Sequence, residues 1–377
     1  MPTWHIITAE YPPTAGGVAD YSKIVAEGLN SAGDHVHVWT PASAAARSAR
    51  NGIELHELPG HFGPRALAAL SRGLGAVNAD CILVQYVPHA FGLKAMNLPF
   101  CLWLAAQRGR NVTVMFHEVA YPVERGQRLR HNFLGTVTHL MALIVARAAG
   151  RIFVATPEWE RTLRKLIPSS KPIVWLPVPS NIPVIDDREA SRSIRSRYSN
   201  NGALLLGHFS TYGGEIAGEL ESSLCAVLPR IPESAVLLVG RNSDQFRVRF
   251  AASHLDFSAR VHASGQLARE DLSLHLSACD LMLQPYRDGI CTRHGSAMAA
   301  VAHGRPIVST FGRLSEPLWA ESGAVALAPA GDAAGLAAEI ARLAADETGR
   351  QRLGRTASEL YKCRFDIKHT IGALRSA

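Results

Sequence analysis

The stretch that decides the fold covers residues 285–310 and reads PYRDGICTRHGSAMAAVAHGRPIVST. A buried strand comes before it, a turn containing glycine breaks the strand, and a helix of small residues follows from about Thr292. The first N–H groups of such a helix have no intrahelical partner and carry partial positive charge. Arg293 adds a full charge at the same place. The pattern therefore predicts a pocket for an anion at this turn.

The same turn carries a carboxylate and two glycines. Asp288 can accept hydrogen bonds from hydroxyl groups of a ligand, and Gly289 and Gly295 allow a ligand to approach the backbone. Gly304 predicts the end of the helix before the next strand, PIVST. A strand, a turn, a helix and a second strand in this order are typical of a parallel α/β sheet.

This segment resembles the donor-sugar motif of the family 4 retaining glycosyltransferases, which have the GT-B fold. That motif has a Glu, seven residues, a second Glu, then Ala-Met-Ala and Gly-x-Pro-Val-Val. Asp288 and Ser296 take the two Glu positions at the same spacing, followed by AMA at 297–299 and GRPIV at 304–308. An Asp in the first place also occurs in the related trehalose-phosphate synthases. Ser296 is the larger departure, because it offers one hydroxyl and no charge where the family's Glu holds the ribose.

A second match lies at residues 4–41, WHIITAEYPPTAGGVADYSKIVAEGLNSAGDHVHVWTP. A short apolar strand and a proline pair come before Gly16 and Gly17, and a helix with apolar residues at helical spacing follows. In the family this glycine pair lets the backbone approach the donor diphosphate across the interdomain cleft, so the resemblance gives this role to Gly16 and Gly17. The alternative is a plain strand-to-helix turn that needs glycine.

The resemblance continues along nearly the whole chain. His117, just past a buried strand, matches a family histidine that reaches the donor sugar. Glu118 beside it either pairs with the nearby basic run or orients an acceptor hydroxyl. The nucleotide base is expected near Gly265 and Gln266. Glu316 matches the Glu of the family's Gly-x-x-Glu segment, but Arg313 stands at the glycine position.

The resemblance also assigns the sugar-holding N–H groups, the catalytic residues and the domains. The N–H groups belong to Gly289, Ile290, Cys291 and Thr292, and the catalytic residues are His117, Asp288 and Arg293. The 377 residues suit two Rossmann-like, doubly wound parallel-sheet domains facing across a cleft. The acceptor-side domain is expected at 1–178, a linker at 179–186, the donor domain at 187–360, and a helix crossing back to the first domain at 361–377.

Two cations that neutralise the leaving diphosphate in the family are missing. Their positions hold His208 and Gly213. A contact aimed at developing charge is commonly worth about 3–4 kcal/mol of barrier, so a replacement is needed. Arg293 is the first candidate, with Arg287 and Arg241 as weaker ones, because a guanidinium can bond two phosphate oxygens at once. His208 can contribute if it is protonated, and core packing is the alternative.

The implied reaction is sugar transfer from a nucleotide diphosphate donor to an unidentified hydroxyl acceptor, with retention at the anomeric carbon and no metal or other cofactor. The leaving phosphate takes the acceptor's proton, so no general base is needed. A non-catalytic relative that binds or activates a partner stays open, as does a different reaction on the same fold. A dinucleotide-dependent dehydrogenase is disfavoured, because no strand ends in Gly-x-Gly-x-x-Gly.

The charge and the apolar segments bear on partners and location. The net charge of +7 has no aromatic-basic platform beside it, which argues against nucleic acid and favours phosphate donors or an anionic membrane surface. Apolar segments at 94–106 and 132–150 are expected to be core helices, with a lipid-linked acceptor and peripheral membrane association as the alternative. The amino terminus has no signal-peptide pattern, and the six cysteines are scattered, which predicts a cytoplasmic protein with reduced thiols.

Overall fold

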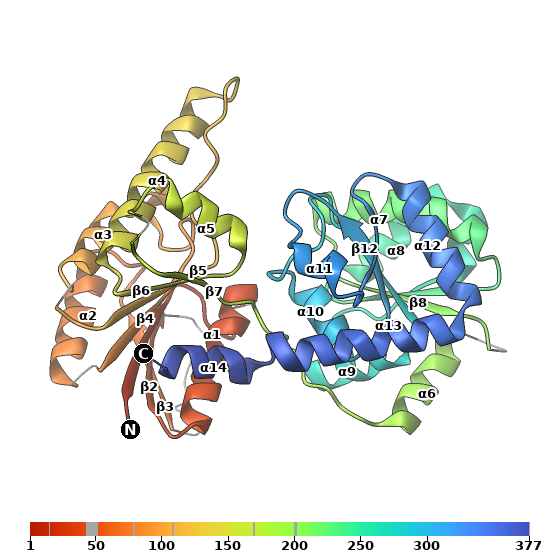
Figure 1. The fold of residues 1–377 in the computed structure, drawn as a ribbon, viewed down its shortest axis with the longest axis horizontal. Coiled ribbons are helices and arrows are strands. Elements are labelled where there is room, and N and C mark those ends of the chain that lie inside the picture. The colour runs from red at the N-terminus through yellow and green to blue at the C-terminus, as the bar shows by residue number, and fades with distance from the viewer. Residues whose placement is uncertain are drawn as a thin grey trace. The chain divides into compact units, whose positions relative to one another are not determined.

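A computed structural model describes residues 1–14, 16–42, 52–77, 80–107, 109–168, 170–199 and 202–376 (Figure 1). The chain forms two compact units, Met1–Val178 with Ile367–Ala377, and Pro179–Asp366. Each unit is a parallel sheet with helices on both faces. The predicted fold class, two Rossmann-like doubly wound domains, is confirmed.

The described residues of the first unit form a seven-stranded parallel sheet in the order β3-β2-β1-β4-β5-β6-β7. Its central strands are continuous apolar runs, as expected for strands covered on both faces, and every residue of β5 is buried. The strands are β1 (Thr3–Thr8), β2 (His35–Pro41), β3 (Ile53–Leu58), β4 (Cys81–Tyr86), β5 (Val112–Phe116), β6 (Arg151–Val154) and β7 (Ile173–Trp175).

Helices cover both faces of this sheet. One face packs against α1 (Gly17–Ser31) and α14 (Ile367–Arg375). The other face packs against α2 (Pro64–Ala76), α3 (Leu98–Ala105), α4 (Leu129–Ala148) and α5 (Pro157–Arg164). The apolar segments at 94–106 and 132–150 thus contribute to this core through α3 and α4. No helix among the described residues combines the length and the hydropathy that crossing a bilayer requires.

The described residues of the second unit form a six-stranded parallel sheet in the order β10-β9-β8-β11-β12-β13. Its strands are β8 (Leu205–Phe209), β9 (Ala235–Val239), β10 (Val261–Ala263), β11 (Leu281–Gln284), β12 (Ile307–Phe311) and β13 (Ala326–Pro329). One face is covered by α7 (Gly214–Val227), α8 (Ser243–Ser253) and α12 (Ala333–Ala345). The other face is covered by α6 (Arg188–Tyr198), α9 (Arg269–Ala278), α10 (Gly295–Ala302), α11 (Pro317–Glu321) and α13 (Glu347–Leu360).

The strand order reverses once in each sheet, between β1 and β4 in the first unit and between β8 and β11 in the second. In open α/β sheets a ligand binds at such a switch point, outside the carboxyl ends of the strands. The turn of residues 285–294 follows β11 directly, so it lies beside the switch point of the second unit.

Two element boundaries differ from those predicted. The helix expected from about Thr292 begins at Gly295, and Thr292 lies in the preceding turn. The predicted crossing segment 361–377 is divided, because residues up to Asp366 pack with the second unit and α14 of the first unit begins at Ile367. Residues 179–186, predicted to be a linker, also pack with the second unit.

Arg151 and Arg375 tie α14 to the first unit. The Arg151 guanidinium donates hydrogen bonds of 2.9 and 2.6 Å to the carbonyl oxygens of Leu374 and Ala373. Arg375 Nε lies 3.0 Å from Oδ2 of the buried Asp34. The last helix is therefore part of the first unit's structure.

Candidate functional site

The turn that connects β11 to α10, residues 285–294, is called the donor turn here. Gly289 has a φ of +86°, a conformation that favours glycine. A Cβ atom at Gly289 would collide with the backbone nitrogen of Gly312 in the loop after β12. Leu314 N–H donates to the Asp288 carbonyl oxygen at 2.9 Å. The donor turn and the loop after β12 therefore pack backbone against backbone, which requires glycine at both contact points.

The four N–H groups predicted to hold sugar hydroxyls all have internal acceptors. Gly289 N–H donates to the Tyr286 carbonyl oxygen at 3.0 Å, and Ile290 N–H to that of Thr310 at 2.8 Å. Cys291 N–H donates to a ring nitrogen of His294 at 3.2 Å. Thr292 N–H donates to both carboxylate oxygens of Glu316, at 3.1 and 3.2 Å. A sugar would have to replace these acceptors, because each of the four N–H groups already has a hydrogen-bond partner within the protein.

Glu316 anchors the donor turn. Its side chain is buried and also accepts a hydrogen bond of 2.7 Å from the Thr292 hydroxyl and one of 2.8 Å from Trp319 Nε1–H. Burial raises the pKa of the Glu316 carboxyl above its usual 4.5, and the bonds from Thr292 and Trp319 counteract part of that rise. The carboxylate predicted to bind the donor is thus engaged in holding the turn.

Ser296, at the position of the family's second Glu, pairs with a tyrosine. Its hydroxyl lies 2.8 Å from the Tyr286 hydroxyl. The Tyr286 ring stacks on His294 with centroids 3.9 Å apart and planes 10° from parallel. Burial, with a smaller contribution from Arg293, lowers the pKa of His294 to about 3, so this ring is neutral at pH 7. The sequence reasoning missed Tyr286, although its position between β11 and Asp288 places it in the turn.

Asp288 forms an ion pair with an arginine that the sequence reasoning counted only as a missing glycine. Arg313 Nη2 lies 3.4 Å from Asp288 Oδ1, and the two side chains are 68% and 49% exposed. Arg287, a weaker candidate for phosphate binding, instead lies 3.1 Å from Glu215 near the start of α7. Arg313 therefore adds a cation at the carboxylate of the donor turn.

Arg293 lies in the donor turn just before α10 and is half-buried. Burial raises the pKa of the Cys291 thiol to about 11, even though the Arg293 charge lowers it in part. Cys291 is therefore a neutral thiol at pH 7, which agrees with a backbone role and not with a nucleophile.

His208, in β8, is buried and neutral. Its Nδ1 lies 3.2 Å from the Tyr212 hydroxyl, and burial lowers the pKa of His208 to about 3. His208 is therefore neutral at physiological pH in this structure, which favours the core-packing alternative over a contact with phosphate. Gly213 immediately precedes α7, and a Cβ there would meet no atom within 4 Å, so the amino end of α7 is unobstructed.

The segment predicted to lie near the base follows β10. Gly265 N–H donates to the Ser243 hydroxyl at 3.0 Å, and the Gly265 carbonyl accepts from Gly240 N–H at 3.3 Å. Gln266 is exposed beside it. Backbone bonds thus fix Gly265 and leave the Gln266 side chain at the surface.

His117, Glu118, Gly16 and Gly17 belong to the first unit. The buried His117 ring pairs through Nε2 with Gln85 Oε1 at 2.8 Å and meets the edge of Tyr21 at 4.8 Å. Burial lowers the pKa of His117 to about 4, so the ring is neutral at pH 7.

Glu118 and the glycine pair have different surroundings. Glu118 Oε2 lies 3.4 Å from His89 Nδ1, and this contact raises the pKa of His89. Gly17 begins α1, and a Cβ there would meet no atom within 4 Å, whereas one at Gly16 would lie 2.6 Å from Glu10 Oε2.

The structure thus gathers part of the predicted site in one place. The donor turn contains Asp288, residues 289–292 and Arg293. The start of α10 contains Gly295 and Ser296, and the adjoining loop contributes Glu316. His208 lies in β8 of the same sheet, and Gly265 and Gln266 follow β10. Within the described part of the chain, the donor turn contains no group of three or more His, Cys, Asp or Glu side chains placed to share a metal ion.

Both units match family models. The model of the Glycosyl transferase 4-like domain matches residues 16–179, and that of Glycosyl transferases group 1 matches residues 219–346. Comparison with curated protein sequences gave no match.

Several solved structures have the same fold. A sucrose-phosphate synthase from Thermosynechococcus elongatus has a TM-score of 0.75 at 17% identity, covering 99% of this chain and 97% of that one. A glycosyltransferase from Rickettsia africae ESF-5 has a TM-score of 0.73 at 13% identity, covering 99% and 96%. Anabaena HepE in complex with UDP has a TM-score of 0.71 at 16% identity, with 100% of both chains covered. With family models matched in both units and two parallel-sheet domains, the chain belongs to the family 4 glycosyltransferases of the GT-B fold.

Proposed function

We propose that the protein is a retaining hexosyltransferase that uses a nucleoside diphosphate sugar. The observation that carries this proposal is the donor turn itself. The exposed carboxylate of Asp288 directly precedes Gly289, whose φ is positive. Gly289 packs against the loop after β12, at the carboxyl edge of the sheet. A uridine donor is the first choice, since HepE was solved with UDP and with UDP-glucose.

Asp288 accepts hydrogen bonds from the sugar hydroxyls in this proposal, and the sugar contact assigned to His117 rests on the family resemblance alone. The ribose meets the hydroxyl pair of Ser296 and Tyr286, which replaces the carboxylate of the family motif. Glu118 stands on the acceptor side, where its pairing with His89 would orient it.

The diphosphate is neutralised by arginines in place of the family's two missing cations. Arg293 lies in the donor turn and Arg313 in the loop after β12, and these two segments pack against each other. A guanidinium can bond two phosphate oxygens and stays charged at any cellular pH. The unobstructed amino end of α7 adds partial positive charge after β8, beside the switch point.

Transfer then needs positioning and charge stabilisation from the protein, and no general base. The bond between the anomeric carbon and the phosphate oxygen breaks while the acceptor oxygen bonds to that carbon on the same face. The acceptor proton passes to the leaving phosphate oxygen, which becomes the terminal oxygen of the nucleoside diphosphate. The protein holds the partners together and stabilises the developing negative charge.

Calorimetric titration with UDP, GDP, ADP and TDP at fixed salt tests the donor class. We expect one nucleotide to bind with micromolar affinity, about −8 kcal/mol. Arg293→Ala should weaken that binding at least tenfold, whereas His208→Ala should change it little, because His208 is neutral. Arg352→Ala, which removes an exposed arginine on α13, is the matched control. Equal affinities for the wild type and the Arg293 variant would remove Arg293 from the diphosphate site.

A second function is favoured by a specific observation. The N–H groups of residues 289–292 are all bonded inside the protein, and the residue at the position of one missing cation is neutral. Such a chain could keep the fold as a non-catalytic, partner-binding subunit. Absence of nucleotide binding at millimolar concentration would favour that function. Turnover of a bound donor, with the anomeric configuration of the product read by NMR, would exclude it.

A lipid-linked acceptor fits one surface of the first unit. The start of α4 and the loop before it carry exposed apolar side chains at Val123, Leu129 and Phe133, which are 52%, 88% and 62% exposed, and this end of α4 projects from its unit (Figure 1). Exposed arginines at 125, 128 and 130 lie among them, which suits an anionic membrane surface. We expect Leu129→Ser with Phe133→Ser to reduce sedimentation with anionic vesicles, and unchanged sedimentation would remove the membrane from the proposal.

A further inference from the structure

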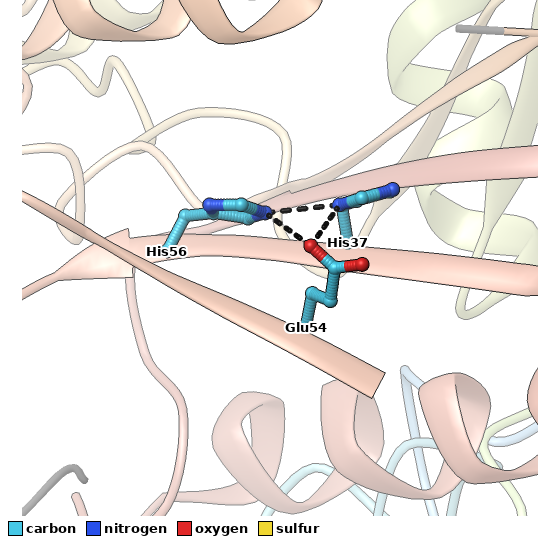
Figure 2. A group of neighbouring side chains, drawn as sticks. All are labelled: His37, Glu54 and His56. Carbon is cyan, nitrogen blue, oxygen red and sulfur yellow. Dashed lines mark hydrogen bonds and ion pairs between the residues drawn. The ribbon is translucent and has the colours of Figure 1, made fainter. Parts of the chain in front are cut away.

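Three side chains with metal-binding atoms converge at the edge of the first unit's sheet, on strands β2 and β3 (Figure 2). His37 in β2 lies directly opposite Glu54 in the neighbouring strand β3. His56 is two residues after Glu54, so the pleat of the strand places both on the same face. Nothing in the sequence motif or in the transfer reaction uses these residues.

The three atoms lie at distances that suit a shared ion. His37 Nδ1 is 2.9 Å from His56 Nε2 and 3.4 Å from Glu54 Oε2, and His56 Nε2 is 3.9 Å from Glu54 Oε2. The point equidistant from the three atoms, in their plane, lies about 2.0 Å from each, which matches zinc–nitrogen and zinc–oxygen bonds of about 2.0–2.2 Å. Figure 2 shows the two ring nitrogens facing each other, with the Glu54 carboxylate oxygen beside both.

The rings are held in place by stacking before any ion binds. His5 in β1 stacks on His37 with centroids 4.7 Å apart and planes at 14°. Trp39 stacks on His56 at 4.1 Å and 13°, and its Nε1–H donates to His5 Nδ1 at 2.9 Å. The Trp39 ring in turn packs so closely on Gly73 of α2 that no Cβ would fit there. These stacking contacts limit the rotation of the two ligand rings.

Charge and access suit a divalent ion as well. Glu54 is 64% exposed and supplies negative charge, and its exposure leaves room for water to complete the coordination. Two imidazoles and a carboxylate are ligands that Zn²⁺ accepts.

We propose that His37, Glu54 and His56 bind one Zn²⁺ ion, with water as the fourth ligand. The ion would join β3, the edge strand of the sheet, to β2 and so stabilise the first unit. Its position differs from the one expected for sugar transfer. His37 and Glu54 lie in the amino-terminal halves of their strands and His56 near the middle of β3, whereas a ligand at the switch point lies outside the carboxyl ends. The proposal is independent of the donor turn, which belongs to the other unit.

The bound ion requires a change of tautomer. The His37–His56 distance of 2.9 Å also fits a hydrogen bond, in which one ring donates to the other. Zn²⁺ needs a lone pair on both of these nitrogens, so the shared proton moves to the far nitrogen of its own ring. The two rings together then carry the same number of protons as before.

The test is calorimetric titration of ZnCl₂ into the full chain, without a purification tag and after treatment with a chelator. We expect one equivalent to bind at micromolar or tighter affinity, and a saturating excess to raise the melting temperature by about 5 °C. Glu54→Gln, a change at an exposed side chain, should weaken binding at least tenfold, and His56→Gln should weaken it further. Replacing Zn²⁺ by Co²⁺ should give the visible absorption of a four-coordinate ion.

Glu57→Gln is the matched control, because Glu57 is an exposed glutamate on the same strand outside the cluster. It should bind Zn²⁺ like the wild type. Far-UV circular dichroism checks that each variant is folded. Binding of equal strength in Glu54→Gln, His56→Gln and the wild type, or wild-type affinity weaker than about 100 µM, would overturn the proposal. Nucleotide titration of the same Glu54→Gln protein should be unchanged, which separates this site from the proposed transferase function.

Discussion

Replacing Glu316 by Gln tests whether this carboxylate holds the donor turn. The carboxylate accepts bonds from the N–H and hydroxyl of Thr292 and from Trp319 Nε1–H. Gln keeps one acceptor oxygen and puts an NH₂ group in place of the other, so at least one buried donor loses its acceptor. Such a loss costs about 1–3 kcal/mol. With a central value of about 2 kcal/mol, the second unit should melt about 4–8 °C lower.

Hydrogen exchange measured by mass spectrometry gives the local reading. The amides of residues 289–294 should exchange about 30-fold faster in the variant, which is the factor corresponding to about 2 kcal/mol. Glu321→Gln is the matched control, because Glu321 is an exposed glutamate on the same short helix, α11. An exchange rate in Glu316→Gln equal to that of the wild type would refute the anchoring role.

The effect also depends on pH, in a direction set by the raised pKa. Burial raises the folded-state pKa of Glu316 above 4.5, so the folded protein binds this proton more tightly than the unfolded chain does. The contribution of this linkage to stability is complete below about pH 4.5 and is lost as the pH rises through the folded pKa. Gln has no such titration. The stability gap between wild type and Glu316→Gln should therefore be wider at pH 5 than at pH 8.

Three further predictions concern the second unit. Tyr286→Phe removes the hydroxyl partner of Ser296 and should weaken UDP binding about three- to tenfold by calorimetry, and unchanged affinity would exclude this pair from the ribose site. Burial lowers the pKa of His208 from 6.5 to about 3, so the unfolded chain binds this proton more readily and the free energy of unfolding should fall as the pH drops below 6.5. His208→Gln should flatten that fall in denaturant titrations, and the same dependence on pH in the variant and the wild type would contradict the reasoning. Gly312→Ala should lower the free energy of unfolding by about 1–3 kcal/mol, because its Cβ would lie 2.7 Å from Asp288 backbone atoms. Gly295→Ala should not destabilise the protein, because its Cβ would meet no atom within 4 Å.

The sequence was sufficient to predict the fold, because its signals are local. The spacing from Asp288 to Ser296 and the small residues at 297–299 fall within one strand-turn-helix unit. Apolar strands alternating with helices also predict parallel sheets without any knowledge of distant contacts. These features were confirmed by both sheets and by both family models.

The interactions that shape the site could not be predicted, because their partners are distant in sequence. Thr292 was expected to start a helix, but its N–H and hydroxyl bind Glu316, 24 residues later. Arg313 was considered only as a lost glycine, and its ion pair with Asp288 depends on the close approach of two loops. His208 could be judged only once its burial was known. The first two outcomes depend on how β11 and β12 bring separate loops together.

The place of α14 in the first unit has a consequence for the order in which the protein folds during synthesis. Ile371 and Leu374 share a core with Val25 and Leu29 of α1, and the Ile371 side chain lies close against Gly28. The side of α1 that packs against α14 therefore stays exposed until the second unit has been synthesised. Domains generally fold in the order in which they emerge. Here the unit that begins first is completed last, so a chaperone that shields α1 would act throughout translation of the second unit.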